Sequence, residues 1–377
     1  MAVAERVLVH GGGIGGLTLA VALGLRGVQV DVVELREDDG ALGVGIIQQS
    51  NALHVMREIG VLDECLAAGF EADLLTICDP RGEVVAQIPQ PRMDGAPASN
   101  GIPRPELSAL LTRAAEKAGA RIRRGTTIAD LTEDDGGVQV VLADGTEGRW
   151  DLVVGFDGIG SPLRRRLYGD AYEPEYTGFA NWRATVPRDP EVRGVVMSTG
   201  NRDVKALLTA ISEESMYIAS VNAEDPGFRP DPERAHEQFK ERVTGFGGAI
   251  ARALEQITGP EHVVYNRISQ VTVDAPWHRG RIVIAGDAAH ASTPHLAQGG
   301  AMAVEDALVL AQELERAETL PQALAAWEER RRPRALWVQS LSRAVLRQET
   351  GQPTTPEDDE LLKVGIPGAA HHLVQPY

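Results

Sequence analysis

The chain has 377 residues, of which 43% are hydrophobic, so two domains, or one domain with a large insertion, are expected around a sizeable core. Its formal net charge of −17 disfavours nucleic acid and anionic membranes as partners. The two cysteines form no metal or disulfide pattern, and strand-like sequence from Arg6 excludes a signal peptide, so we predict a cytoplasmic protein without a metal site or membrane span.

The first predicted unit is a β-α-β unit over residues 6–35. An apolar strand ends at His10, a glycine turn follows, and a buried helix leads to a second strand that ends at Glu34. Gly11, Gly13 and Gly16 form GxGxxG, which places a pyrophosphate at the helix N-terminus. A carboxylate at Glu34 suits ribose hydroxyls and opposes a 2′-phosphate. The unit therefore favours NAD or FAD over NADP, the alternative being a plain glycine turn with a surface glutamate.

The pattern of apolar and polar residues along the rest of the chain predicts a discontinuous nucleotide-binding domain with an insertion. Segments between Tyr172 and Ala275 alternate apolar and polar residues or are rich in β-branched residues, which indicates a mostly antiparallel sheet. After them, "RIVIAGDAAH" again begins with an apolar run typical of a buried strand. Residues 303–347 are expected to be helical, with an interruption at Pro333, and the Pro- and Asp-rich tail to be loosely held. The predicted boundaries are 1–80, 100–171 and 276–347 for the nucleotide-binding domain with its C-terminal helices, 81–99 and 172–275 for the insertion, and 348–377 for the tail.

Two later motifs each follow an apolar strand. "DGIGSPLRR" begins at Asp157, and "GDAAHASTPHLAQGGAMAVEDA" carries Asp287. Either could be an ordinary capped turn. The second has neither GxGxxG nor a distal ribose acid, so we interpret it as the far wall of the first nucleotide site rather than as a second one.

In this order the three motifs resemble those of the class A flavoprotein monooxygenases, the family of para-hydroxybenzoate hydroxylase. The resemblance includes "GVGIIQQSNAL", "PRPELSALL" and "WEERRRPRA", and spans most of residues 6–345. It implies an α/β fold: a Rossmann-like FAD-binding domain with an inserted, mostly antiparallel β-sheet substrate domain and C-terminal helices.

The resemblance also implies a set of FAD-binding residues. They are Gly11, Gly13, Gly15 and Gly16 at the pyrophosphate, Glu34 at the adenosine ribose, Gly43 and Gly45 in a loop near the ring, Arg104 on the flavin side, Asp157 for FAD and the nicotinamide nucleotide, Asp287 at the ribityl hydroxyls, and Pro294, Gly299, Gly300 and Ala301 at the flavin ring. For Arg104 the alternative is a surface arginine beside a helix. Three positions differ from residues common in the family: Leu35, Gly40 and Gly160. These differences concern how FAD is bound and how the nicotinamide nucleotide docks.

In that family NAD(P)H reduces FAD, O2 adds to flavin C4a, and the resulting hydroperoxide hydroxylates an electron-rich aromatic or heteroaromatic ring. We therefore predict a monomeric or homodimeric hydroxylase of a small aromatic substrate. The substrate is expected between the insertion and the flavin, near Trp182, Arg183, Asn222 and Pro294.

Three residues are catalytic candidates. Lys205 and Tyr217 lie on two strands expected to be neighbours, where a basic group beside a tyrosine could lower a phenol's pKa and relay its proton. His295 could act as a base beside the flavin. The alternatives are a surface lysine, a half-buried sheet tyrosine and a structural turn histidine.

Other functions remain open at this point. A flavin halogenase or a reductase could share the fold, but "ANWRATVP" contains only Trp182 and no WxWxIP motif. A non-catalytic dinucleotide-binding module would not need a complete substrate sheet. "RRRPRA", which begins at Arg330, is expected to form a salt-bridged helix face, and His290 to pack locally.

Overall fold

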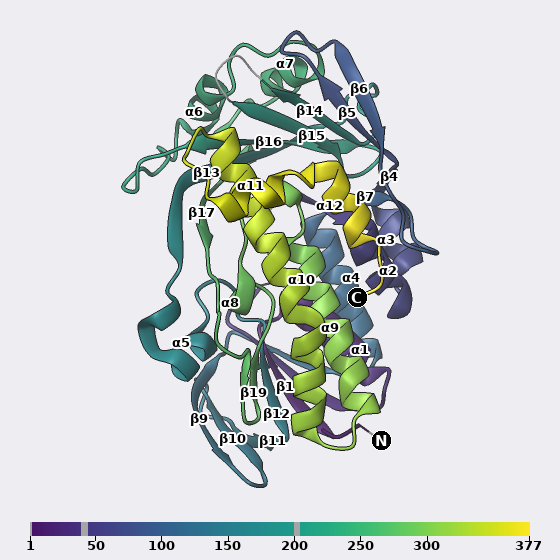
Figure 1. The fold of residues 1–377 in the computed structure, drawn as a ribbon, viewed down its shortest axis with the longest axis vertical. Helices are drawn as coiled ribbons and strands as arrows, with labels where there is room; N and C mark the ends of the chain where they lie inside the picture. Colours follow the sequence, from purple (N-terminus) through teal and green to yellow (C-terminus); the bar gives the residue numbers. More distant parts are fainter. Residues whose placement is uncertain (1, 39–43, 200–203) are drawn as a thin grey trace.

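The structure, a computed structural model, describes residues 2–38, 44–199 and 204–377. Within these residues a six-stranded sheet and a seven-stranded sheet lie at opposite ends of the molecule, and two long helices run side by side along it (Figure 1). The longer helix, α10 (Leu320–Glu349), extends from the six-stranded sheet to the seven-stranded one.

The six-stranded sheet is the predicted Rossmann-like sheet, in the order β18-β19-β12-β1-β2-β8. All its neighbours are parallel except β18 and β19. The strands are β1 (Arg6–His10), β2 (Gln29–Glu34), β8 (Arg121–Arg124), β12 (Leu152–Gly155), β18 (His278–Arg279) and β19 (Ile282–Ile284). Because β1, β12 and β19 are adjacent, the three motifs that follow them meet at one edge of the sheet.

Helices α1 (Ile14–Gly24), α4 (Arg104–Lys117) and α9 (Gly299–Arg316) form the main helical layer, with α10 packed on α9. Helix α1 is apolar and buried along most of its length, as a helix between other helices should be. The predicted interruption at Pro333 is wrong, because α10 continues through it. Arg331 and Arg334, on either side of the proline, are held by acids of α9, and this packing outweighs the lost backbone bond.

The seven-stranded sheet has the order β17-β13-β16-β15-β14-β5-β6, and only β14 and β5 are parallel. It confirms the predicted, mostly antiparallel insertion. The strands are β5 (Leu74–Cys78), β6 (Val84–Pro89), β13 (Glu175–Pro187), β14 (Val195–Thr199), β15 (Lys205–Ala210), β16 (Ser215–Ala223) and β17 (Val263–Gln270). The chain thus enters this sheet at Leu74, before the predicted boundary at residue 81; the domain boundaries themselves stay a prediction.

The two faces of this sheet have different neighbours. Helices α6 (Ala235–Arg242) and α7 (Gly248–Glu255) cover one face and enclose a core around Trp182 and Phe239. The other face packs against residues of the FAD-binding part, among them Val44 and Leu346.

The remaining elements are short. The small sheets are β3-β7-β4, from β3 (Gly45–Gln49), β7 (Ser99–Pro103) and β4 (Phe70–Ala72), and β11-β10-β9, from β9 (Ile128–Asp134), β10 (Gly137–Leu142) and β11 (Glu147–Trp150). The other helices are α2 (Ser50–Glu58), α3 (Leu62–Ala68), α5 (Pro162–Tyr168), α8 (Asp287–His290), α11 (Pro356–Leu362) and α12 (Gly365–Leu373), with 3₁₀ turns η1 (Gly169–Tyr172), η2 (Pro260–His262) and η3 (Pro294–Leu296). No helix of the described residues is long and apolar enough to cross a membrane.

The tail is not loosely held as expected. Thr355 and Asp358 form a capping box at the start of α11, and Asp358 also pairs with Arg347 at 2.6 Å. Leu373 of α12 is buried in the main core. The Pro- and Asp-rich composition that suggested looseness is instead a helix-start signal.

Candidate active site

The first glycine turn, between β1 and α1, combines tight packing with one open side. Gly11 has φ +110°, and a Cβ there would overlap the Phe156 carbonyl. A Cβ on Gly16 would overlap the Gly11 carbonyl, and one on Gly15 would lie 2.6 Å from Phe156 Cδ1. A Cβ on Gly13 would meet no atom within 4 Å. Gly13 therefore faces the space that a pyrophosphate needs.

The N-terminus of α1 fits a phosphate. It has no side-chain cap and no acid in its first turn, so its first N–H groups are available to an anion. Glu34, at the end of β2, accepts from the Gly12 N–H at 2.7 Å and from the Arg36 N–H at 3.0 Å. Each carboxylate oxygen keeps a second lone pair for a ribose hydroxyl.

Asp157 is turned inward. Its Oδ2 accepts from the Leu163 N–H at 3.0 Å and lies 3.3 Å from His10 Nδ1, while Oδ1 is buried without a hydrogen-bond partner among the described residues. His10 Nε2 in turn lies 2.8 Å from Thr127 Oγ1. Asp157 thus fixes the turn before α5, and its direct contact with FAD stays a prediction.

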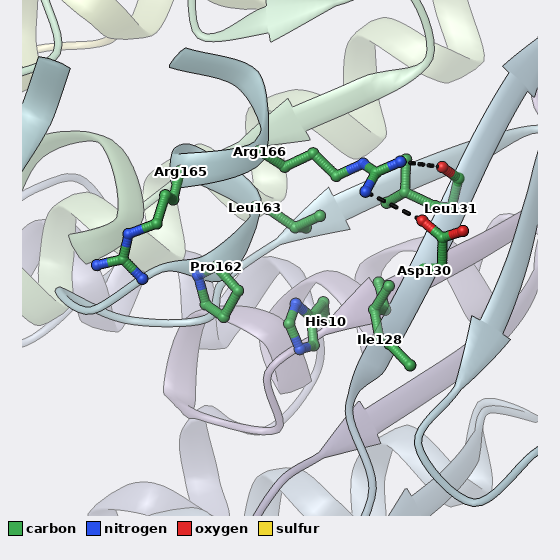
Figure 2. A pocket seen from close by; sticks show the side chains of 9 residues that line it. His10, Ile128, Asp130, Leu131, Pro162, Leu163, Arg165 and Arg166 are labelled. Carbon is green, nitrogen blue, oxygen red and sulfur yellow. Dashed lines mark hydrogen bonds and ion pairs between the residues drawn. The ribbon is translucent and has the colours of Figure 1, made fainter. Parts of the chain in front are cut away.

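A pocket of about 600 Å³ opens beside His10, between β9 and α5 (Figure 2). His10, Ile128 and Pro162 face the same space in the figure, and Arg166 reaches across to Asp130 at 3.0 Å. His10 directly precedes Gly11, so this pocket lies beside the start of the first glycine turn. It contains none of the predicted substrate residues.

The second glycine turn, before α9, offers the same kind of helix N-terminus. Asp287 is exposed at the start of α8, and Ala297 adopts φ +52° just before Gly299 begins α9. Helix α9 has no side-chain cap and no acid in its first turn. The first N–H groups, at Gly299, Gly300 and Ala301, therefore suit the carbonyl-bearing edge of a flavin.

A buried ion network supports this second turn, and sequence reasoning missed it. Asp306 of α9 accepts from the Gly286 N–H at 3.0 Å and pairs with His290 at 2.6 Å and Arg331 at 2.8 Å. Burial alone would raise the pKa of Asp306, but His290 and Arg331 hold it below its usual range. The predicted salt-bridged face is thus partly a core, since Arg331 is 0% exposed. The signal was the acid pair Glu305-Asp306 between two apolar stretches of α9, AMAV and ALVLA.

The sheet face opposite α6 and α7 is the one that faces the predicted substrate position. Arg183, Leu207 and Tyr217 share this face, because strand side chains alternate and the register sets Arg183 and Leu207 opposite Ala219. Burial raises the pKa of Tyr217. A Cβ on Gly45 would lie 2.9 Å from Tyr217 Cδ1, so this glycine lets β3 approach the sheet closely.

Two predicted substrate residues lie on the wrong face. Trp182 neighbours Arg183 on β13 and therefore points the other way, where it stacks on Phe239 at 6.0 Å and donates to Glu224 at 3.0 Å. Asn222 pairs with Ala180 and shares that side. Arg104 is exposed at the start of α4, and Gly43 lies outside the described residues.

The predicted pairing of Lys205 with Tyr217 is also wrong. They lie on neighbouring strands, but Lys205 is opposite Val221 and Tyr217 is opposite Thr209, roughly 13 Å further along the hairpin. Lys205 instead forms an ion pair with Glu349, whose other oxygen lies 3.9 Å from His295 Nε2. His295 Nδ1 is 3.1 Å from Thr293 Oγ1, and burial, helped by Lys205, lowers its pKa to about 4.

Comparisons with known proteins agree with this geometry. A family model described as an FAD binding domain matches residues 5–341. YetM of Bacillus subtilis (strain 168), provisionally named as an FAD-dependent monooxygenase, is 33% identical over 94% of this chain and 96% of its own. The 6-hydroxynicotinate 3-monooxygenase of Pseudomonas fluorescens is 30% identical, covering 91% of each. HpxO of Klebsiella pneumoniae, solved with FAD and uric acid, has the same fold, with a TM-score of 0.85 at 24% identity, covering 98% of this chain and 97% of that one.

Proposed function

The chain belongs to the FAD-dependent monooxygenases, and we propose that it uses NAD(P)H and O2 to hydroxylate an electron-rich aromatic or heteroaromatic substrate. One observation carries the proposal. Two uncapped helix N-termini, at Ile14 of α1 and Gly299 of α9, lie after strands β1 and β19 of one six-stranded sheet, although 285 residues separate them in the chain (299 − 14), and a mixed polar and apolar sheet face stands opposite the second.

The residues present fit FAD. We propose that Gly13 and the first N–H groups of α1 hold the pyrophosphate, that Glu34 holds the adenosine ribose, and that Asp287 meets the ribityl hydroxyls. The start of α9, with Gly299, would then bind the pyrimidine edge. When bound, FAD supplies the redox chemistry, taking a hydride from NAD(P)H and activating O2.

The protein's own part is to hold the substrate ring and to exclude water. We propose that the ring lies between Pro294 and the sheet face, where Leu207, Ala219 and Val264 supply an apolar wall. Arg183 and Tyr217 are two polar groups on this face, and they would orient a ring hydroxyl or an anionic ring atom. A relative named for hydroxylating 6-hydroxynicotinate supports a phenol or a hydroxylated nitrogen heterocycle as the substrate class.

The alternatives on the same fold are a halogenase and a reductase. The structure weakens the first further, since Trp182 lies on the far face of the sheet in a core with Phe239. A non-catalytic module would not need Arg183 and Tyr217 on the face toward α9. A cytoplasmic location and a monomeric or homodimeric state stay predictions.

The experiment begins with the purified holoenzyme and its flavin spectrum. NADH and NADPH oxidation is then followed across phenols and hydroxylated pyridines, and products are weighed by mass spectrometry. A gain of one oxygen atom in the product is the expected result. Failure to take up FAD contradicts the proposed function. Chloride-dependent chlorination of the substrate indicates a halogenase, and a product that gains hydrogen but no oxygen indicates a reductase.

A further inference from the structure

Three elements meet in one Lys-Glu-His cluster at the edge of the proposed substrate space. Lys205 is the first residue of β15, Glu349 is the last residue of α10, and His295 lies in η3. The Glu349 carboxylate stands between the other two: Oε1 pairs with the Lys205 ammonium, and Oε2 lies 3.9 Å from His295 Nε2. The side chains are 30%, 18% and 6% exposed for Lys205, Glu349 and His295, so the cluster leads from the surface inward.

The cluster belongs to the wall of the substrate space. Lys205 lies on the same sheet face as Leu207, two residues along β15. Its cross-strand partner Val221 packs against a small cluster that contains Leu346, one turn before Glu349 on α10. His295 directly follows Pro294, which we place at the flavin edge. The Lys205 ammonium is therefore a cation at one corner of this space, and Glu349 already occupies it.

The second cation of this face is not neutralised in the same way. Within the described parts of the chain, Arg183 has no carboxylate partner: its guanidinium donates to Asn266 Oδ1, and its Nε is buried without a partner. Lys205 and Glu349 together carry no net charge, and His295 is neutral near pH 7, since its pKa is lowered to about 4. The corner at Lys205 is thus neutral, whereas the centre of the face keeps the positive charge of Arg183.

We propose that Glu349 sets the charge preference of the substrate site. By neutralising Lys205, it makes this corner favour aromatic substrates without a carboxylate there over those that have one. A substrate carboxylate would have to compete for Lys205 with Glu349, an internal carboxylate held beside it at high effective concentration and of like charge to the substrate. Glu349 is then a specificity-determining residue that acts through Lys205. This inference rests on the proposed function and narrows its substrate class.

The test measures binding to the oxidised holoenzyme and needs no turnover. Matched acid and amide probes, 6-hydroxynicotinate with its carboxamide and 4-hydroxybenzoate with its carboxamide, are titrated while flavin absorbance is followed. The wild-type protein should bind the amides at least as tightly as the acids. Glu349→Gln keeps the side-chain shape and releases the ammonium, so the acids should gain about tenfold relative to the amides.

Three controls isolate the pair. Lys205→Gln leaves Glu349 unpaired and should shift the ratio further against the acids, while the double variant Lys205→Gln/Glu349→Gln should return it toward the wild-type value. Glu237→Gln removes the same charge from α6, beyond the opposite face of the sheet, and should leave the ratio unchanged.

If the acid-to-amide affinity ratio of Glu349→Gln equals that of the wild-type protein, the proposal is overturned. This holds also where the wild-type protein binds the acids weakly or undetectably. If that variant does not retain flavin, Lys205→Gln decides, and a ratio that does not move against the acids counts as refutation. The two proposals fail separately. A protein that takes up no FAD refutes the proposed function, whereas an unaltered acid-to-amide ratio in flavin-loaded protein refutes only the role of Glu349.

Discussion

Each of the two glycine turns of this protein leads into an uncapped helix N-terminus, but different contacts hold the two turns in place. The turn before α1 is shaped by close backbone packing, since side chains on Gly11 and Gly16 would overlap carbonyl oxygens. The turn before α9 has looser glycines, with the nearest atom to a Cβ on Gly299 at 3.7 Å, and depends on the buried ion network around Asp306. A helix N-terminus can thus be prepared for a ligand either by local sterics or by charges brought from another helix.

The largest expected effect comes from breaking the charges behind the second turn. Arg331→Met leaves Asp306 without its guanidinium and Glu305 with Arg334 as its remaining cationic partner, so the free energy of unfolding should fall by about 3–5 kcal/mol. Flavin content should fall too, because Asp306 holds the Gly286 N–H. Urea unfolding followed by circular dichroism measures the first effect, and the flavin spectrum the second.

Arg316→Met is the matched control. Arg316 is exposed and pairs with Glu313 at 3.7 Å, so its loss should cost under about 1 kcal/mol. Equal losses for the two variants would mean that the buried network does not support the turn.

The second effect is a pH dependence on the α9 side. His295 has a folded pKa near 4, below its ordinary 6.5, so the unfolded chain binds its proton first as the pH falls. The stability that neutral His295 contributes is therefore complete above about pH 6.5 and is lost between pH 6.5 and 4, by roughly 2–3 kcal/mol. His295→Asn should flatten this part of the stability profile, measured as urea midpoints at pH 7 and 4.5. An unaltered slope contradicts the assignment.

A third effect separates the two turns by sterics alone. Gly16→Ala forces a Cβ into the Gly11 carbonyl and should cost about 1–3 kcal/mol. Gly299→Ala should change stability by less than about 0.5 kcal/mol, since its Cβ would make an ordinary contact with Ser292. Thermal unfolding of the two variants side by side measures the difference, and similar values would remove the contrast.

The smallest effect on stability is expected at Gly13. Gly13→Ala meets no protein atom within 4 Å, so stability should change by less than about 0.5 kcal/mol. The added methyl group occupies the approach to the pyrophosphate, so FAD should bind about tenfold more weakly. Fluorescence titration of apoprotein with FAD measures this. Gly227→Ala, also in open space, is the control, and equal FAD affinities would place the pyrophosphate elsewhere.

Sequence reasoning succeeded where the determining contacts are local. The strand, glycine turn, helix and second strand from Arg6 to Glu34 form one β-α-β unit, although Phe156 also packs against its turn, and the insertion could be recognised from its alternation. It failed where a distant partner decides. No local pattern pairs Arg331 with Asp306 or Lys205 with Glu349.

Two errors could have been avoided from the sequence. Trp182 and Arg183 are adjacent on a strand, so alternation alone forbids both from facing one substrate. Thr355-Pro356-Glu357-Asp358 has the pattern of a helix start, although the composition of the tail predicts a loose segment. The register of Lys205 against Tyr217 could not have been known, because it depends on the length of the connection between β15 and β16.

Helix α10 carries both Arg331, behind the second turn, and Glu349, at the corner of the substrate space. These residues are separated by about 27 Å along the helix axis. The buried ion pairs of Arg331 fix one end of the helix, and the regular helix geometry then sets where Glu349 lies at the other end. Deleting a single residue between them would rotate Glu349 by about 100° around the axis and leave Arg331 in place. Relatives that differ in length within this segment should therefore differ in which side chain meets the lysine of β15, even where their flavin-binding motifs are the same.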